Sequence, residues 1–442
     1  MTINFKNATW WVSLFLTLSI SLYATGSFFL YIIYSVLLLL IGVKRPNISI
    51  SAYILIIPFT NYAFSTGIIS ELTNLIPVFF LINGLIINWL FHNKVYLHQS
   101  VLMLTAMVFI LVTLSSVAYL VNFRETGLAS TFLFFAQSLL AVLVASNIAK
   151  NTCDTNHIVY SLVLSALIVS VFALINMELF YGRLTLGGNV RHLANPVGIS
   201  IVILGVFFVE KLVFNHPMKN KVTLLLLVLF VYLNIILIAT ISRGMILNTY
   251  ITLALIFVFS YFFSIKNSSI KNAVLNIFKI VAAMIVLLLA TYFSISFGLS
   301  EFDFDLNIIV GRFERSMGSD PRFNIWSTAI SNMASRHWIV GNGVEGFRKL
   351  HMISGADFYA HSVFVDVLVS TGLLGFLSII LFLGYIQISL FKYFTSLGLG
   401  MFLSLVLFHL THGRIYTGEF WLYLGICVGL LELAKQQKAK LS

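Results

Sequence analysis

Most of the sequence consists of apolar runs separated by short polar connections. A helix needs about 20 apolar residues to cross the hydrocarbon core of a bilayer, where it satisfies its own backbone polar groups. The pattern therefore predicts an all-α polytopic integral membrane protein with about 12–14 transmembrane helices. The runs lie at residues 9–23, 26–43, 51–69, 75–91, 100–121, 128–148, 158–180, 194–214, 222–240, 244–264, 276–298, 362–388, 395–411 and 417–434.

One connection, residues 299–361, is much longer than the others. Connections of that length within a compact protein are usually functional. We therefore divide the chain into membrane helices at 1–298, a loop at 299–361 and further membrane helices at 362–442, all within one integral membrane domain.

A helix is expected to begin inside this loop. Asp320 is a favourable N-cap, Pro321 suits the first helical position, and Arg322 follows in the first turn. Gly341-Asn342-Gly343 then ends the helical segment. An apolar stripe at helical spacing lies between, formed by Trp326, Ile330, Met333 and Trp338.

Lysines and arginines fall on opposite faces of the predicted membrane domain. All lysines except Lys349 lie on one side, and all arginines except Arg45 lie on the other. Because cytoplasmic loops are enriched in basic residues, the lysine side is expected to be cytosolic. Both termini are then cytosolic, and the long loop faces the periplasm of a Gram-negative cell across its inner membrane.

The arginine side predicts phosphate recognition. Only arginine offers a planar, permanently charged fork that binds phosphate through two hydrogen bonds. The arginines on this face are Arg124, Arg183, Arg191, Arg243, Arg312, Arg315, Arg322, Arg336, Arg348 and Arg414.

Composition agrees with a membrane protein and excludes other classes. The chain is 60% hydrophobic and 9% charged, with a mean hydropathy of +1.00. Its net charge of +11 comes largely from the lysine-rich loops and forms no basic stripe, so nucleic acid is not an expected partner. Two cysteines do not make a disulfide framework.

Three segments on the arginine side carry candidate chemistry. One is the glycine-containing stretch from Arg183 to Arg191-His192, which leads to a helix start at Asn195-Pro196. Another is Ser242-Arg243-Gly244, where a charge lies close to hydrocarbon and needs a partner. The third is His361, where the loop re-enters the membrane and the helix dipole favours a neutral imidazole.

Each of these features has a structural alternative. Arg243 can extend towards lipid headgroups, Arg322 can be solvated on a helix lying on the bilayer, and His361 can be purely structural. Asp303 and Asp305 are interpreted as an acidic solvated turn, and neither a metal nor a cofactor is expected. Further candidates for contacts with phosphate or sugar are Arg312, Arg315, His337 and Arg414.

The His361 segment resembles a family signature. His361-Ser362, nine residues and then Gly372-Leu-Leu-Gly375 is similar to the His-[Asn/Ser/Gln]-x9-Gly-x-x-Gly motif of the bacterial O-antigen ligase family, which includes O-antigen polymerases and protein O-oligosaccharyltransferases. Ser242-Arg243-Gly244 resembles the family's arginine at an outer helix end. Arg322 with Trp326, and Gly341-Asn342-Gly343 with Phe347, resemble its ectodomain motifs.

The resemblance implies a GT-C-like, metal-independent and inverting membrane glycosyltransferase. It would move a glycan from undecaprenyl pyrophosphate to an acceptor hydroxyl at the periplasmic face. Arg243 and Arg322 would hold the pyrophosphate, and His361 would orient or deprotonate the acceptor. The lipid A–core of lipopolysaccharide is the expected acceptor, as for an O-antigen ligase. A polymerase of O-antigen or capsule repeat units is the alternative within the family.

A flippase for lipid-linked oligosaccharides is an alternative from another class. A flippase is expected to carry charges near the bilayer midplane. The apolar runs here are nearly free of charge, with Asp366 the chief exception. Transfer of glycan by the purified protein in detergent would exclude it, because flipping needs a bilayer.

Overall fold

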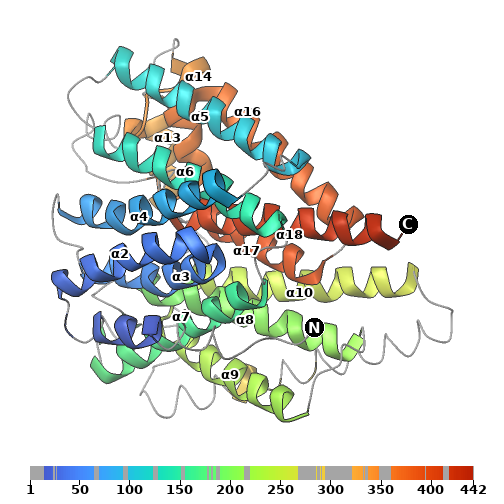
Figure 1. Ribbon diagram of the computed structural model, residues 1–442. Coiled ribbons are helices and arrows are strands. Elements are labelled where there is room, and N and C mark those ends of the chain that lie inside the picture. The colour runs from blue at the N-terminus through green and yellow to red at the C-terminus, as the bar shows by residue number, and fades with distance from the viewer. Residues whose placement is uncertain are drawn as a thin grey trace. The chain divides into compact units, whose positions relative to one another are not determined.

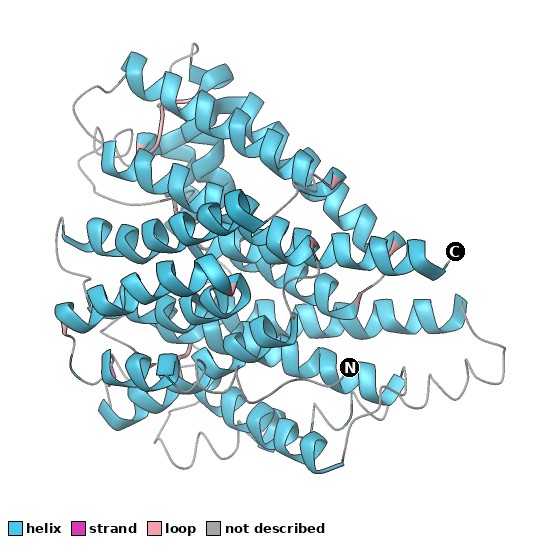
Figure 2. Cartoon of the chain, in the orientation of Figure 1, coloured by secondary structure: helices cyan, strands magenta, loops and turns pink. Residues whose placement is uncertain are grey.

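The computed structural model describes most of the chain, with gaps. The described residues are 14–22, 25, 27–63, 69–92, 98–122, 128–150, 155–176, 179–180, 183–185, 190–213, 220–266, 285, 289, 291–293, 321–331, 333, 337–347, 360–393, 395–411 and 418–441. Figure 2 shows that nearly all of them are helical.

The chain forms two compact units, each built from separate stretches of sequence. Unit 1 comprises residues 1–158, 316–395 and 408–442, and unit 2 comprises residues 159–315 and 396–407. The long helices of unit 1 are α2 (Phe28–Lys44), α3 (Pro46–Ala63), α4 (Ile69–His92), α5 (Gln99–Asn122), α6 (Leu128–Ala149), α16 (Val363–Lys392) and α18 (Gly418–Leu441).

Two shorter helices, α13 (Pro321–Ser331) and α14 (His337–Val340), also belong to unit 1. Unit 2 contains most of α7 (Thr155–Asn176), the strands β1 (Leu179–Phe180) and β2 (Arg183–Leu184), α8 (Val190–Val213), α9 (Asn220–Ala239) and α10 (Arg243–Lys266). Most of α17 (Ser396–Thr411) belongs to it as well.

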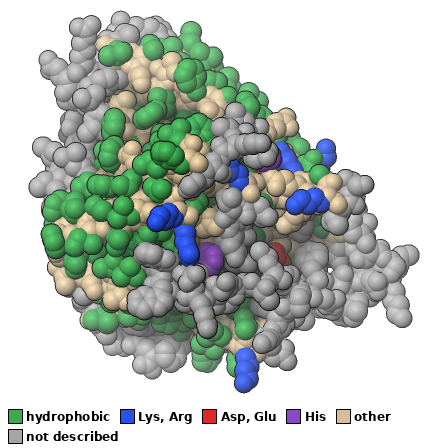
Figure 3. All heavy atoms as spheres, viewed as in Figure 1, with side chains coloured by type: hydrophobic (Ala, Val, Ile, Leu, Met, Phe, Trp, Pro, Cys, Tyr) green, Lys and Arg blue, Asp and Glu red, His purple; other side chains and the backbone are tan. Residues whose placement is uncertain are grey.

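The structure confirms the predicted class. Seven described helices are long and apolar enough to cross a membrane, and four shorter apolar helices accompany them. Each expected span from 26–43 to 244–264, and each of the last three, overlaps a described helix. The span at 276–298 lies mostly outside the described residues. In the view of Figure 3, hydrophobic side chains cover broad areas and basic side chains occupy only a few places.

Two predicted boundaries in unit 2 were wrong. The run expected to be helical to residue 180 ends as helix at Asn176, and Leu179–Phe180 instead pairs antiparallel with Arg183–Leu184. The next helix begins at Val190, before Pro196 and not at it. Proline removes only one helical hydrogen bond, and close packing of the following turns holds this helix in place.

Glycines set the close packing of helices in unit 1. Side chains added at Gly425 and Gly429 of α18 would meet Ala141 and Ile148 of α6 at 2.6 and 2.5 Å, so the two helices touch along their length. Small residues allow such close approach where apolar burial alone gives no preference between lipid and protein. The contacts advance in the same direction along both chains, so α6 and α18 are parallel.

Four long helices of unit 1 begin and finish at two opposite ends of the unit. Tyr385 near the end of α16 and Lys435 near the end of α18 both contact Ser100 at the start of α5. Helices α16, α18 and α6 therefore all begin at the opposite end, where α5 finishes. Figure 1 shows α5 and α16 running alongside each other, in agreement with their contacts.

Unit 2 also contains a parallel helix pair. A side chain added at Gly198 of α8 would lie 2.7 Å from the Thr249 hydroxyl of α10, and one at Gly205 would overlap Leu253. The contacts advance together, so the starts of α8 and α10 lie at the same end. The end of α9 leads directly into α10 there, and β2 packs against α9.

Candidate functional site

His361 has an unusual backbone conformation at the start of α16. Its φ is 52°, in the left-handed region that residues other than glycine rarely adopt. Ser362 follows as the N-cap, and its hydroxyl accepts a hydrogen bond from the Val365 N–H at 3.4 Å. The imidazole is half-buried and precedes a helix N-terminus, as the sequence predicts.

Such a conformation costs free energy of order 1–3 kcal/mol and persists only where the surroundings impose it. Residues in this state cluster at functional sites, so the observed φ supports a functional interpretation of His361 over a purely structural one.

The Gly341–Gly343 loop is bound to a break in α16. Gly372 interrupts the helix with φ 67° and ψ −171°. The carbonyls just before the break accept hydrogen bonds from the loop: Asn342 N–H to Val369 O at 2.8 Å, and Gly343 N–H to Ser370 O at 2.9 Å. A side chain at Gly341 would overlap the Ser370 backbone, and one at Gly372 would overlap Ile339. Gly341 and Gly372 therefore allow the two backbones to come into contact, because any side chain at either position would prevent it.

Trp326 connects α13 to the segment that carries His361. Its indole Nε1–H donates to the carbonyl of Ala360 at 2.5 Å. Beneath this bond lies a small apolar core that joins α13, the loop after α14 and the first turns of α16. The core consists of Ala329, Met333, Phe347, Ala360 and Val369, with Ile325, Trp326 and Val365 packed against it.

Trp338 does not belong to this core. It is 40% exposed, whereas Met333 is buried, so the predicted apolar stripe ends at Met333. The physical reason is that α13 stops at Ser331 and α14 starts a new helix at His337, which breaks the 3.6-residue periodicity.

Arg322 lies on the same helix face as Trp326, one turn nearer to the N-terminus of α13. The rise over four residues is about 6 Å, and Trp326 contacts the residue next to His361. The arginine is half-buried in the first turn, as predicted. In unit 1, therefore, Arg322 and His361 belong to two helix starts that one hydrogen bond and one apolar core hold together.

The sequence did not single out Glu345. This residue has a φ of 65°, and its carboxylate accepts a hydrogen bond from Ser130 Oγ of α6 at 2.9 Å. This hydrogen bond attaches the loop to α6, in addition to the backbone bonds that attach it to α16. A carboxylate two residues after the Gly-Asn-Gly turn was the available signal, but acidic loop residues are usually solvated, so the pattern alone favours no contact.

Arg243 is the first residue of α10 in unit 2. The turn before it is tight: Ile241 has a φ of 48°, and the Ser242 carbonyl accepts the Ile246 N–H at 2.9 Å. The Thr240 hydroxyl donates to Leu237 O at 2.6 Å and accepts the Ser242 N–H at 3.2 Å. These bonds hold the short turn of residues 240–242 between α9 and α10, and the arginine is half-buried at a helix N-terminus.

Two other predicted residues of unit 2 lie at this end. Arg191 and His192 fall within the first turn of α8, and Arg183 begins β2. Because α8 and α10 are parallel, the backbones of Arg191 and His192 lie at the end of unit 2 where Arg243 lies. Their side chains are outside the described part of the structure.

The remaining candidates have different outcomes. His337 begins α14 and its side chain is buried, and its carbonyl accepts the Gly341 N–H at 2.7 Å. Arg312, Arg315 and Arg414 lie outside the described residues. Within the described ranges, no group of three His, Cys, Asp or Glu side chains is arranged to hold a metal ion.

Fold and site together define the class of this protein. It is a polytopic α-helical membrane protein in which the short helix α13 and the loop after α14 are packed against the broken start of a long apolar helix. Residues 225–380 match the family model for O-antigen ligase. This is the family that the histidine motif resembles, and the match confirms that resemblance over residues 225–380. No match is found among curated proteins.

The matched region contains Arg243, Arg322 and His361, together with both glycine motifs. The family implies a glycosyltransferase of the ligase or polymerase type, acting on a lipid-linked glycan and an acceptor. Arg183, Arg191 and Arg414 lie outside it.

Proposed function

We propose that this protein is an inverting, metal-independent glycosyltransferase of the inner membrane that works at its periplasmic face. It transfers a glycan from undecaprenyl pyrophosphate to a hydroxyl of the lipid A–core, as an O-antigen ligase. The observation that carries the proposal is His361, held in a left-handed conformation at the start of α16 by the helix that bears Arg322.

The first requirement of the reaction is the release of pyrophosphate from the donor. A pyrophosphate leaving group departs with concentrated negative charge, so fixed guanidinium groups at helix N-termini lower the barrier to its departure. Arg322 in α13 and Arg243 in α10 both lie at helix starts. We assign both to the lipid pyrophosphate, with Arg183, Arg191, Arg312, Arg315 and Arg414 as secondary candidates.

The second requirement is the activation of the acceptor hydroxyl. Its hydroxyl oxygen attacks the anomeric carbon while the bond from that carbon to the pyrophosphate oxygen breaks, and the hydroxyl proton must leave. A neutral imidazole accepts that proton, and the N-terminus of α16 disfavours the imidazolium before reaction. Attack from the face opposite the leaving group inverts the anomeric configuration.

A polymerase is the second candidate, because the matched family covers both activities. The two enzymes differ only in the acceptor, which for a polymerase is the next lipid-linked repeat unit. Analysis of glycolipids in a deletion strain separates them. Loss of a ligase leaves polymer on the undecaprenyl carrier, and loss of a polymerase leaves single repeats on the core.

The proposal is tested with purified protein in detergent, supplied with lipid-linked glycan and acceptor. His361→Ala is expected to lower the transfer rate by roughly 100- to 10,000-fold, the usual contribution of a general base. His157→Ala, near the start of α7, is the control and should retain the wild-type rate. Full activity of correctly folded His361→Ala would contradict the assignment of the base.

A further inference from the structure

Three lysine ammonium groups surround one tyrosine at the end of unit 1 where α16 and α18 finish. The Nζ atoms of Lys392, Lys435 and Lys438 lie 5.6, 6.0 and 5.4 Å from the centroid of the Tyr393 ring. Lys392 and Lys438 are exposed, and Tyr393 is half-buried between the two helix ends. We refer to these four residues as the Tyr393 cluster.

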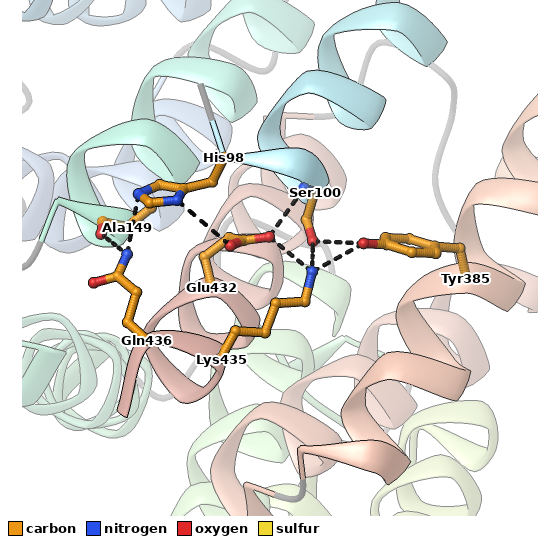
Figure 4. Close-up of polar contacts among 7 residues, drawn as sticks. All are labelled: His98, Ser100, Ala149, Tyr385, Glu432, Lys435 and Gln436. Atoms are coloured by element: carbon orange, nitrogen blue, oxygen red, sulfur yellow. Dashed lines mark hydrogen bonds and ion pairs between the residues drawn. The ribbon is translucent and has the colours of Figure 1, made fainter. Parts of the chain in front are cut away.

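Lys435 is fixed in this cluster by a buried polar network (Figure 4). Its ammonium group donates to Ser100 Oγ at 2.7 Å, Tyr385 Oη at 2.9 Å and Glu432 Oε1 at 2.9 Å. An ammonium has three N–H donors, so all of them are used inside the protein. Lys435 therefore supports the cluster with its charge. The ammonium groups of Lys392 and Lys438 form no hydrogen bond with any other described residue, which leaves their donors for a ligand.

The network extends to α5 and α6. Glu432 also accepts the Ser100 backbone N–H at 2.9 Å and lies 3.9 Å from His98. Gln436 donates to the Ala149 carbonyl at 2.6 Å. Burial acts to lower the pKa of Lys435, but its hydrogen bonds with Tyr385 and Glu432 hold that pKa above its ordinary value, so the amine stays charged.

The two helices that carry the cluster do not neutralise it. Their sequences contain only three acidic residues. Asp366 and Glu419 lie in the first turns of α16 and α18, at the opposite end of the unit. Glu432 is already paired with Lys435 at 2.9 Å. The ammonium groups of Lys392 and Lys438 thus contact the same ring, and no carboxylate of α16 or α18 is left to balance their charges.

The cluster lies at the level expected for lipid headgroups. The candidate membrane span of α16 ends at Lys392, and tyrosines and lysines are typical of the bilayer interface. Along α16, exposed apolar side chains continue from Lys392 at helical spacing. They are Leu377, Leu381 and Ile388.

We propose that the Tyr393 cluster binds the phosphate group of an anionic phospholipid. Lys392 and Lys438 hold the phosphate oxygens, Lys435 adds its charge, and the exposed face of α16 receives the acyl chains. The apolar face favours a membrane lipid over free phosphate, because a soluble anion needs no such surface. The site is separate from the proposed catalytic machinery, since the helical part of α16 between them spans about 30 Å.

Native mass spectrometry of the full-length protein tests the proposal. The protein is released from vesicles that contain phosphatidylcholine and phosphatidylglycerol, and the lipids that it retains are counted. Wild-type protein should retain phosphatidylglycerol in preference to phosphatidylcholine. The double variant Lys392→Ala/Lys438→Ala should bind phosphatidylglycerol roughly 30-fold more weakly, the effect of removing two lysines near a charged surface.

The matched control is Lys44→Ala/Lys221→Ala, which removes two exposed lysines from α2 and α9. It should retain phosphatidylglycerol like the wild type. An equal loss in both double variants would overturn the proposal, as would wild-type protein that does not discriminate between the lipids. Addition of inorganic phosphate should leave the bound lipid in place. Displacement of the lipid by inorganic phosphate would identify a soluble phosphate site and refute the lipid assignment.

Discussion

At the scale of single residues, the chemistry of the site depends on backbone conformations that most residues avoid. His361 and Glu345 have positive φ values without being glycine, and Gly341 and Gly372 have them at points where two backbones meet. The surrounding contacts must compensate for this strain. The position of the imidazole is therefore a property of the packed loop and not of His361 alone.

Arg322→Lys tests whether the start of α13 needs a guanidinium that binds phosphate through two hydrogen bonds or only a positive charge. Lysine keeps the charge but cannot form two parallel hydrogen bonds with a phosphate. We expect a loss of at least tenfold in transfer rate, and roughly 100-fold or more for Arg322→Ala. Arg45→Lys, exposed at the end of α2, is the control. An unchanged rate in Arg322→Lys would argue against bidentate recognition.

Gly372→Ala tests the break in α16. An added side chain would meet the Ile339 carbonyl at a positive φ, so the Gly341–Gly343 loop must separate from the helix. We expect destabilisation of about 1–3 kcal/mol and a loss of transfer activity. Gly384→Ala on the same helix has open space around it and should be neutral or slightly stabilising. Thermal unfolding in detergent measures both.

At the scale of elements, α13 and α14 pack on the start of α16 through a small core and a few backbone bonds. Leading contributions are the buried Phe347 and Met333, the bond from Trp326 and the two hydrogen bonds of the Gly-Asn-Gly turn. These contacts place the helix that carries Arg322 beside the helix that begins after His361, so the proposed site depends on the packing of these elements.

Trp326→Phe separates packing from hydrogen bonding. Phenylalanine keeps an aromatic ring in the core but loses the indole N–H that binds Ala360 O. A buried carbonyl left without its donor costs about 1–3 kcal/mol. We expect His361 to lose its orientation, with a lower maximal rate, little change in the apparent affinity for the lipid-linked donor, and a changed pH profile.

Trp338→Phe is the matched control, because that indole is 40% exposed and lies outside the core. Its rate and pH profile should equal those of the wild type. A purely structural role for Trp326 predicts another result: lower stability with an unchanged pH profile in the fraction of protein that stays folded.

At the scale of the whole molecule, the chain passes from unit 1 to unit 2 and back twice. Unit 1 takes residues from the beginning, the middle and the end of the sequence, and it carries both the His361 segment and the Tyr393 cluster. The parallel order of α6, α16 and α18 puts these two features at opposite ends of the unit. The proposed functions therefore require that the two ends face opposite sides of the membrane.

Cysteine labelling tests this orientation. In a Cys153→Ser background, Ser331→Cys on the exposed side of α13 should react with an impermeant reagent in intact spheroplasts. Lys438→Cys should react only after permeabilisation. The remaining native Cys427 is buried and serves as the blank. If Ser331→Cys required permeabilisation, the periplasmic assignment of the site would be refuted.

The sequence by itself determined the class of protein and the positions of most helices, and it supplied the candidate residues of the proposed site. Apolar runs, capping residues and the separation of lysine from arginine are local signals, and the O-antigen ligase match supports the same segments. The start of α13 at Pro321 and the end of α14 at Val340 follow from local backbone preferences, which need no partner.

Only the tertiary structure decided how these segments meet. No local pattern indicates that Trp326 binds Ala360, that Asn342 binds a carbonyl at the Gly372 break, or that Lys392 and Lys438 converge on Tyr393. The same holds for the early start of α8, where packing outweighs a proline signal. The physical reason is that each contact joins residues distant in sequence, and its energy depends on neighbours that only the folded chain supplies.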